Sequence, residues 1–239
     1  MSFLSESSVS ESSDAIAAAL KAVRARLEKA ELEYERVPRS VQLLAVSKTR
    51  GPSHILAAYS CGQRHFAENY LQEALDKMAQ LPSDITWHFI GPIQSNKTRP
   101  LAEHFDWVHT IEREKIAQRL DAQRPAGRPP LNVLLQVNVS GEASKSGVSL
   151  AELPALAAAV VKLPNLKLRG LMTIPAPETD FAAQRHAFRQ LARARDLLVA
   201  EGFDSCTDLS MGMSQDMEAA VAEGATMVRI GTDIFGMRA

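Results

Sequence analysis

The sequence has little of what marks a disulfide-stapled, membrane or nucleic-acid-binding protein. Its 239 residues include two cysteines, Cys61 and Cys206, which are too few for a disulfide framework. The formal net charge is -1, so the overall charge gives no sign of a nucleic-acid or membrane partner. No apolar run reaches bilayer-spanning length, and no cysteine–histidine spacing suggests a metal site. We therefore expect a cytoplasmic globular protein without metal, membrane or nucleic-acid partners.

The N-terminal segment also lacks the features of a secretory signal. MSFLSESSVSESSD has neither a basic start nor an apolar core. Residues 1–13 are rich in serine and glutamate, and we expect a mobile tail there. Asp14 could cap a helix reaching about Glu35, because apolar residues then recur at helical spacing. No Pro/Gly/Ser-rich linker divides residues 14–239, which predicts one domain with an extra N-terminal helix.

Eight short apolar runs follow this helix, and helical stretches separate most of them. The runs predict strands at 41–47, 64–68, 86–90, 107–110, 132–139, 166–173, 208–211 and 227–230. Helices are expected at 52–60, 71–81, 97–103, 113–123, 150–163, 180–201 and 214–223. Eight strand–helix repeats in this length match a closed (β/α)8 barrel. An open doubly wound sheet is the rival, but no Gly-x-Gly-x-x-Gly turn follows the first strand.

Lys48 ends the first predicted strand in "LLAVSKTR". In a (β/α)8 barrel, the chemistry sits at the carboxyl ends of the strands. A lysine at a partly apolar strand end has its pKa lowered by desolvation, which makes its amine nucleophilic. The alternative is a strand-end charge that extends to solvent, and this segment alone favours the alternative.

The turns after the last two predicted strands supply a second feature. Gly212-Met213-Ser214 precedes a helix that Ser214 could cap, and Gly231-Thr232 offers a backbone N–H and a hydroxyl. Together they resemble the phosphate site of (β/α)8 barrels, although each can also be an ordinary cap or turn. A nucleophilic lysine and a phosphate site in one barrel mouth suggest pyridoxal 5'-phosphate (PLP), held as a Schiff base.

Long ordered motifs run through all the predicted strands. They read "LLAVSKTR", "FAENYLQE", "WHFIGPIQSNKTR", "VHTIER", "LLQVNVSGEASKSGV", "LRGLMTIPAP" and "LSMGMSQDMEAAVAEGATMVRIGTDIFG". Over residues 41–238 the sequence resembles the YggS/PROSC family of PLP-binding (PLP homeostasis) proteins. The resemblance implies a single (β/α)8 TIM barrel similar to the N-terminal barrel of alanine racemases.

The resemblance also implies, motif by motif, a set of cofactor-binding residues. Lys48 would form the Schiff base. Arg229 would face the pyridine nitrogen and leave it unprotonated, because a guanidinium only donates. An ion pair of Arg229 with Glu68 or Glu223 inside the barrel is the alternative. The other residues implied are Asn69 beside the ring, Met211 and Met172 near it, and Ser214, Gly231 and Thr232 at the phosphate.

The expected function is that of a PLP carrier or regulator without robust catalysis. A neutral pyridine ring is a weaker electron sink. Alanine racemases also use a tyrosine base completed by a C-terminal β domain, which we expect to be missing after Ala239. Of the tyrosines, Tyr70 lies nearest the predicted site, but it starts a predicted helix, where its side chain can face outward. No catalytic residue is therefore assigned.

The implied partners are PLP, apo PLP-dependent enzymes and free amino acids. Through them the protein would affect the balance of amino acids and keto acids. A monomer is the favoured oligomeric state. The alternatives are a weak amino-acid racemase or other PLP enzyme and, more remotely, a Schiff-base aldolase that works without PLP.

Three features remain open at this level. Asp233 stands where the family usually has alanine, and it either lies near the phosphate turn or points away. Lys97 and Arg99 of "QSNKTR" either meet an anionic ligand or flank a helix start. His88 alternates with Trp87 and Phe89, so we expect a histidine whose hydrogen bonds are satisfied inside the barrel, and contact with the site is the less favoured alternative.

Overall fold

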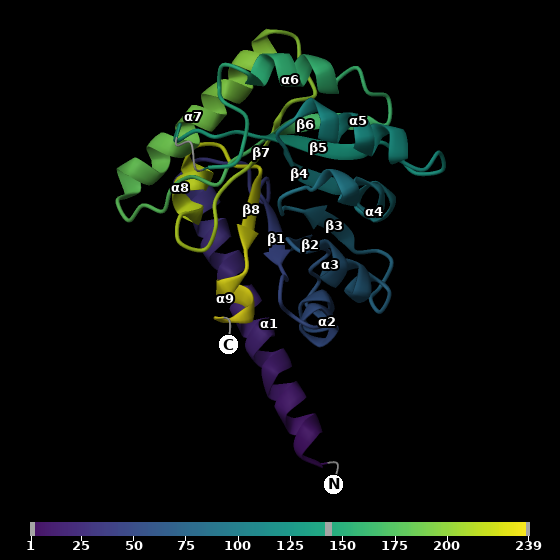
Figure 1. Cartoon of the computed structure of the whole chain (residues 1–239). Helices are drawn as coiled ribbons and strands as arrows, with labels where there is room; N and C mark the ends of the chain where they lie inside the picture. Colours follow the sequence, from purple (N-terminus) through teal and green to yellow (C-terminus); the bar gives the residue numbers. More distant parts are fainter. Residues whose placement is uncertain (1–2, 142–144, 238–239) are drawn as a thin grey trace.

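Strands and helices alternate around a closed barrel in the computed structural model, which describes residues 3–141 and 145–237 (Figure 1). The eight parallel strands pair in chain order, and β1 also pairs with β8, which closes the sheet. The strands are β1 Gln42–Val46, β2 His65–Glu68, β3 Thr86–Phe89, β4 Trp107–Ile111, β5 Leu131–Gln136, β6 Leu166–Met172, β7 Asp208–Ser210 and β8 Met227–Ile230. All eight expected strands are present, so the (β/α)8 barrel is confirmed.

Helices cover the outside of the barrel. They are α1 Phe3–Glu33, α2 Pro52–Ser60, α3 Leu71–Met78, α4 Thr98–His104, α5 Glu114–Gln123, α6 Leu153–Val160, α7 Phe181–Ala200, α8 Met217–Ala222 and α9 Thr232–Phe235, with a 3-10 turn, η1, at Ser95–Lys97. The expected helices are confirmed, while α9 was not predicted. Over the described ranges, no helix is both long and apolar enough to cross a bilayer.

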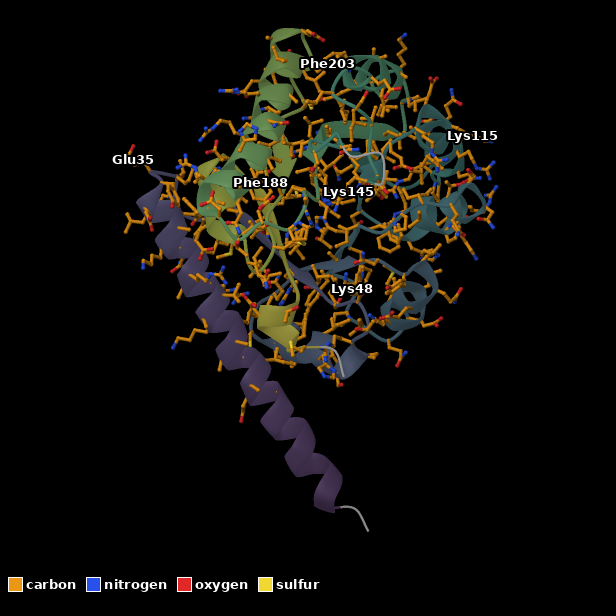
Figure 2. The ribbon with its side chains drawn as sticks, turned by 60° about the vertical axis from the view of Figure 1, so that its left-hand side comes forward. Glu35, Lys48, Lys115, Lys145, Phe188 and Phe203 are labelled. Atoms are coloured by element: carbon orange, nitrogen blue, oxygen red, sulfur yellow. The ribbon has the colours of Figure 1, made fainter. Side chains whose placement is uncertain are left out.

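The helix before the barrel begins earlier than the sequence indicates. α1 begins at Phe3, not at Asp14, because no proline or glycine interrupts residues 3–33. Leu20 and Val23 bury one face of it against the barrel, and its first turns project beyond the barrel (Figures 1 and 2). Whether residues 1–13 are mobile stays a prediction, and Met1 and Ser2 lie outside the described residues.

Alternate side chains of each strand enter different cores. In β1, Leu43 and Ala45 join the apolar cluster that also contains the helix residues. Leu44 and Val46 belong to a small separate cluster inside the barrel, against which Trp107 packs. Several polar side chains are also buried, and burial is costly for a polar group unless it finds a hydrogen-bond partner. Glu68, Lys77 and Arg229 are among these buried groups.

Candidate functional site

Lys48 lies just beyond the first strand rather than on it. β1 ends at Val46, and Lys48 follows in a turn closed by the Arg50 N–H donating to the Ser47 carbonyl at 3.1 Å. The Lys48 side chain is half-buried (Figure 2). Its ammonium therefore does not bear the full cost of a core position.

A polar network fixes the residues on both sides of Lys48. The Lys77 ammonium donates to the Ser47 carbonyl at 2.8 Å and to Glu68 Oε1 at 2.8 Å, and it pairs with Glu73 at 2.6 Å. The Ser47 hydroxyl also donates to Glu68 Oε1, at 2.6 Å, and Glu73 Oε1 accepts the Thr49 N–H at 2.6 Å. Thr49 has a φ of 64°, an unfavourable angle for a β-branched residue. The network thus holds a strained turn around the lysine.

The other predicted positions follow neighbouring strands. Asn69 follows β2, Ser214 follows β7, and Gly231 and Thr232 follow β8, so together with Lys48 they occupy four adjacent turns of the closed barrel. Gly231 approaches β1 closely, because an added Cβ would lie 3.2 Å from the Val46 carbonyl oxygen. The structure therefore brings the lysine and both predicted phosphate turns to one mouth of the barrel.

The turn containing Ser214 differs from the expected helix cap. The N-cap of α8 is Asp216, not Ser214, and residues 214–216 form a turn before the helix. Asp216 Oδ1 accepts the Met213 N–H at 2.5 Å, which satisfies the backbone before the helix begins. Gly212 has a φ of 91°, and an added Cβ would lie 2.5 Å from Ala220 Cβ. The Ser214 side chain is left partly exposed and Thr232 is exposed.

Arg229 is a buried cation inside the barrel. Its Nη1 donates to Ser210 Oγ and its Nη2 to the Thr173 carbonyl, both at 2.9 Å. Burial lowers the pKa of Arg229 to about 10, so the guanidinium stays charged at neutral pH. The alternative of an ion pair is wrong for the described residues, because Glu68 pairs with Lys77 and Glu223 pairs with Arg185 and Arg189.

Three histidines extend from Arg229 across the barrel interior. Ser210 Oγ lies 2.9 Å from His109 Nδ1, His109 Nε2 lies 3.0 Å from His88 Nδ1, and His88 Nε2 lies 3.0 Å from His65 Nδ1. Arg229 can only donate, so the Ser210 hydroxyl accepts from it and has its own hydrogen available for His109 Nδ1. When Ser210 donates in this direction, Nδ1 of each histidine accepts and Nε2 carries the hydrogen. The expectation that His88 is satisfied is confirmed.

The buried groups suit an anionic cofactor with an acceptor nitrogen. Arg229 forms no direct ion pair with a carboxylate among the described residues, although the more distant Asp216 carboxylate partly opposes the lowering of its pKa by burial. It also retains N–H groups beyond those used for Ser210 and Thr173. Asn69 Oδ1 is buried and has no hydrogen-bond partner among those residues. Lys48 supplies an amine and Ser214 and Thr232 supply hydroxyls at the same mouth. These donors and acceptors fit PLP.

The two buried methionines occupy less informative positions. Met172 and Met211 are both fully buried, and Met211 packs in the apolar cluster shared with the helices. Their place near a cofactor ring stays a prediction. Lys97 and Arg99 flank the start of α4, which is one of the two alternatives for "QSNKTR".

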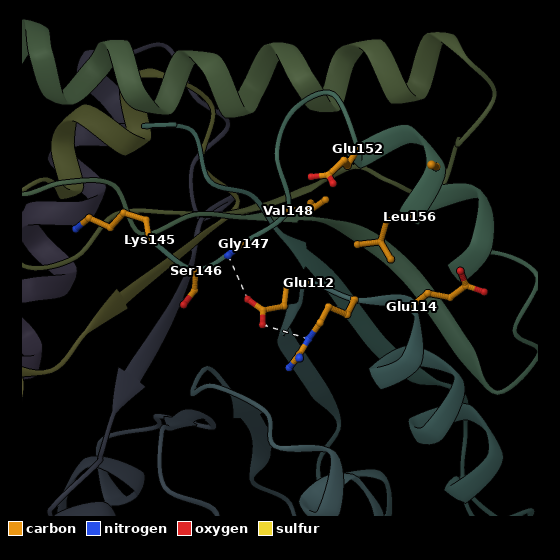
Figure 3. Close-up of a pocket in the computed structure, with 10 residues that line it drawn as sticks. Glu112, Glu114, Lys145, Ser146, Gly147, Val148, Glu152 and Leu156 are labelled. Carbon is orange, nitrogen blue, oxygen red and sulfur yellow. Dashed lines mark hydrogen bonds and ion pairs between the residues drawn. The ribbon is translucent and has the colours of Figure 1, made fainter. Parts of the chain in front are cut away.

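A cavity of about 720 Å³ lies elsewhere, beyond β4 and before α6 (Figure 3). Glu112 lines it, accepting the Gly147 N–H at 3.2 Å and pairing with Arg113 at 3.5 Å. None of the residues predicted for the cofactor lines this cavity. The candidate site is therefore defined by its side chains rather than by the volume of a cavity.

Comparison with known proteins agrees with this geometry. The family model described as "Alanine racemase, N-terminal domain" matches residues 13–239. A pyridoxal phosphate homeostasis protein of Pseudomonas aeruginosa is 60% identical over 224 residues, covering 93% of this chain and 96% of that protein. The chain belongs to the family of pyridoxal phosphate homeostasis proteins. The pyridoxal phosphate homeostasis protein of Escherichia coli K12 is 54% identical over 227 residues, covering 93% of this chain and 97% of its own.

Solved structures support the same family and fold. PipY of Synechococcus elongatus with PLP bound is 39% identical, with a TM-score of 0.81, and the match covers 92% of this chain and all of that one. Alanine racemase of Corynebacterium glutamicum has a TM-score of 0.73 at 17% identity, with 95% of this chain and 62% of that one covered. The racemase likeness shows only that the two share a fold.

Sequence reasoning missed the supporting groups of the site. His65 and His109 lie on the strands next to that of His88, which was predicted, and the inward-facing alternation on those strands was the available signal for them too. Nothing in the sequence marked Lys77 as buried, because a lysine on a predicted helix is ordinarily exposed. Arg26 of α1 was missed for the same reason, although it reaches the turn of Ser214.

Proposed function

We propose that this chain binds PLP as a Schiff base on Lys48 and acts in intracellular PLP homeostasis, as a carrier or regulator. Ser214, Gly231 and Thr232 would hold the phosphate, Asn69 would lie beside the ring, and Arg229 would donate to the pyridine nitrogen. The observation that carries the proposal is the buried Arg229, which forms no direct ion pair with a carboxylate among the described residues and lies on the strand that leads into the Thr232 turn.

The tyrosines support binding rather than robust catalysis. Tyr59 donates its hydroxyl to Asp84 at 2.7 Å, and Tyr34 stacks on Phe181. Tyr70 precedes α3 and is 51% exposed, which is a poor setting for a positioned base. When bound, PLP supplies an electrophilic aldehyde and an electron-withdrawing ring. The charged Arg229 would keep the ring nitrogen unprotonated and limit that withdrawal.

An absorbance spectrum of the purified protein with added PLP tests the assignment of Lys48. Lys48→Ala should abolish the Schiff-base absorbance, and borohydride reduction of the wild type should leave the label on the peptide containing Lys48. Lys115→Ala is the matched control, because Lys115 is exposed on α5, away from Lys48 (Figure 2). A Schiff-base spectrum that survives Lys48→Ala unchanged would overturn the assignment.

The same protein can be tested for catalysis. α-Proton exchange of a panel of amino acids in deuterated water should be negligible for a carrier. Robust exchange that depends on Lys48 would favour the racemase instead. We also propose a cytoplasmic monomer that exchanges PLP with apo enzymes, and the two free cysteines are compatible with that compartment.

A further inference from the structure

Two carboxylates lie beside the turns proposed to hold the phosphate. Asp233 directly follows Thr232 in the first turn of α9, and Glu218 is in the first turn of α8, after Ser214. Unpaired carboxylates next to a phosphate dianion would repel it. Asp233 does not point away from this region, because both carboxylates contact the same guanidinium.

That guanidinium belongs to Arg26 of α1. Its Nε lies 2.5 Å from Glu218 Oε1, and its Nη1 lies 2.8 Å from Asp233 Oδ2. Its Nη2 donates to Glu218 Oε2 at 2.8 Å and to the Ser214 carbonyl at 2.6 Å. The hydrogen bond from Arg26 lowers the pKa of Glu218, so this carboxylate is ionised at neutral pH. One side chain thus joins α8, α9 and the serine turn.

The packing of α1 holds Arg26 in this place. Val23 and Leu27 of the same helix are buried in the apolar cluster, and α1 packs against α2, α8 and α9. Figure 1 shows α1 running past α8 and α9 on the outside of the barrel. Arg26 therefore reaches the two turns only while α1 lies against the barrel.

We propose that Arg26 is a positioning residue for the phosphate end of the cofactor site. It pairs with Glu218 and Asp233, offsets part of their combined negative charge and holds the Ser214 carbonyl, so retention of a phosphorylated cofactor depends on the docking of α1. The inference rests on the proposed function, because it concerns the same phosphate turns. It also explains how a carboxylate is tolerated at position 233. Asp233 pairs with Arg26 of α1, a helix that lies outside the strand–helix repeat.

Binding of PLP and of pyridoxal, which has no phosphate, distinguishes this role from a general stabilising one. Arg26→Ala should weaken PLP binding roughly three- to tenfold, as expected for two newly unpaired carboxylates acting through solvent. Pyridoxal binding should stay within about twofold of the wild type, because it does not meet those charges. Arg26→Lys should restore part of the difference.

A second substitution and a matched control make the test specific. In the Arg26→Ala background, Asp233→Asn should recover part of the PLP affinity, whereas in the wild-type background it should change little. Arg64→Ala is the control, because it removes a comparable surface ion pair just before β2, in which Arg64 Nε lies 3.0 Å from Asp84 Oδ2. It should leave the ratio of PLP affinity to pyridoxal affinity unchanged.

The outcomes separate this inference from the proposed function. Equal losses for PLP and pyridoxal, or an unchanged PLP affinity in Arg26→Ala, would overturn the role of Arg26 while the Lys48-dependent spectrum remained. Absence of that spectrum in the wild type would instead overturn the proposed function.

Discussion

At the scale of single residues, the buried pair of Lys77 and Glu68 determines the surroundings of Lys48. Both side chains are almost fully buried, at 5% and 0% exposure, and their charged atoms are 2.8 Å apart. Burial raises the pKa of Glu68, while the Lys77 ammonium and the Ser47 hydroxyl oppose that rise. Removing one partner would leave the other charge buried and unpaired, which costs more than the pair itself contributes.

Lys77→Met should therefore lower the free energy of unfolding by about 3–5 kcal/mol, as measured by urea denaturation. Lys77→Met combined with Glu68→Leu should recover much of that loss, because the one carboxylate left without Lys77 is then Glu73, which is partly exposed to solvent. Lys115→Ala serves as the control and should stay within about 0.5 kcal/mol of the wild type, as is usual for an exposed position. A single Lys77→Met variant as stable as the wild type would contradict the coupling.

At the scale of secondary-structure elements, the turn between β7 and α8 places Ser214. The turn needs a left-handed residue at Gly212, where the φ is 91°, and it needs close approach to α8, because an added Cβ would meet Ala220 Cβ at 2.5 Å. Asp216 Oδ1 then accepts the Met213 N–H at 2.5 Å and closes the turn before the helix. Backbone geometry, more than the serine itself, thus shapes this turn.

Gly212→Ala should destabilise the protein by about 2–4 kcal/mol, the combined cost of left-handed strain and overpacking. It should also weaken PLP binding more than pyridoxal binding, because the displaced turn carries Ser214. Gly127→Ala is the control, since nothing lies within 4 Å of an added Cβ there. Thermal unfolding and the two affinities measure both effects, and similar values for the two variants would refute the argument.

At the scale of the whole molecule, a chain of polar side chains crosses the barrel interior. It joins half-buried His65 on β2 through His88 and His109 to Ser210 and Arg229 on the far strands. Burial keeps the pKa of His88 and that of His109 well below the ordinary value, and Arg229 adds to the effect at His109. For His65, burial lowers the pKa while Asp106 opposes that change. The buried histidines are therefore neutral in the folded protein.

The neutral histidines of the barrel interior predict that the folded protein loses stability in mild acid. The unfolded state takes up protons below a histidine pKa of about 6.5, while the buried rings do not, so stability falls as pH falls below that value. Two such histidines should lower the free energy of unfolding by about 2–3 kcal/mol between pH 7.5 and pH 5.5. Urea denaturation at both pH values measures the difference.

Two variants assign this loss to the interior. His109→Gln should reduce the pH-dependent difference by about half, because glutamine keeps hydrogen-bonding groups without titrating. His104→Gln, at an exposed position on α4, should leave the difference unchanged. A pH dependence that is identical in the wild type and His109→Gln would show that other groups cause it.

Local patterns predicted the strands and most helices, and contacts between distant segments explain what they did not predict. The short apolar run at 227–230 and the helical spacing from Ile16 to Leu27 are carried by residues near one another in the sequence. The cap at Asp216 was missed because a serine, two residues earlier, satisfied the same local rule. The start of α1 at Phe3 was missed because Ser/Glu-rich composition was taken to indicate a tail.

The sequence by itself determined the strand–helix repeat, the turns at which Lys48, Ser214 and Thr232 stand, and the family. These depend on periodicity and on motifs that are continuous along the chain. Only the tertiary structure decided that Lys77 fixes the turn around Lys48, that the interior histidines lead to Arg229, and that Arg26 pairs with Asp233. Each of these contacts joins different strands or helices, and closure of the barrel and docking of α1 bring them within hydrogen-bond distance.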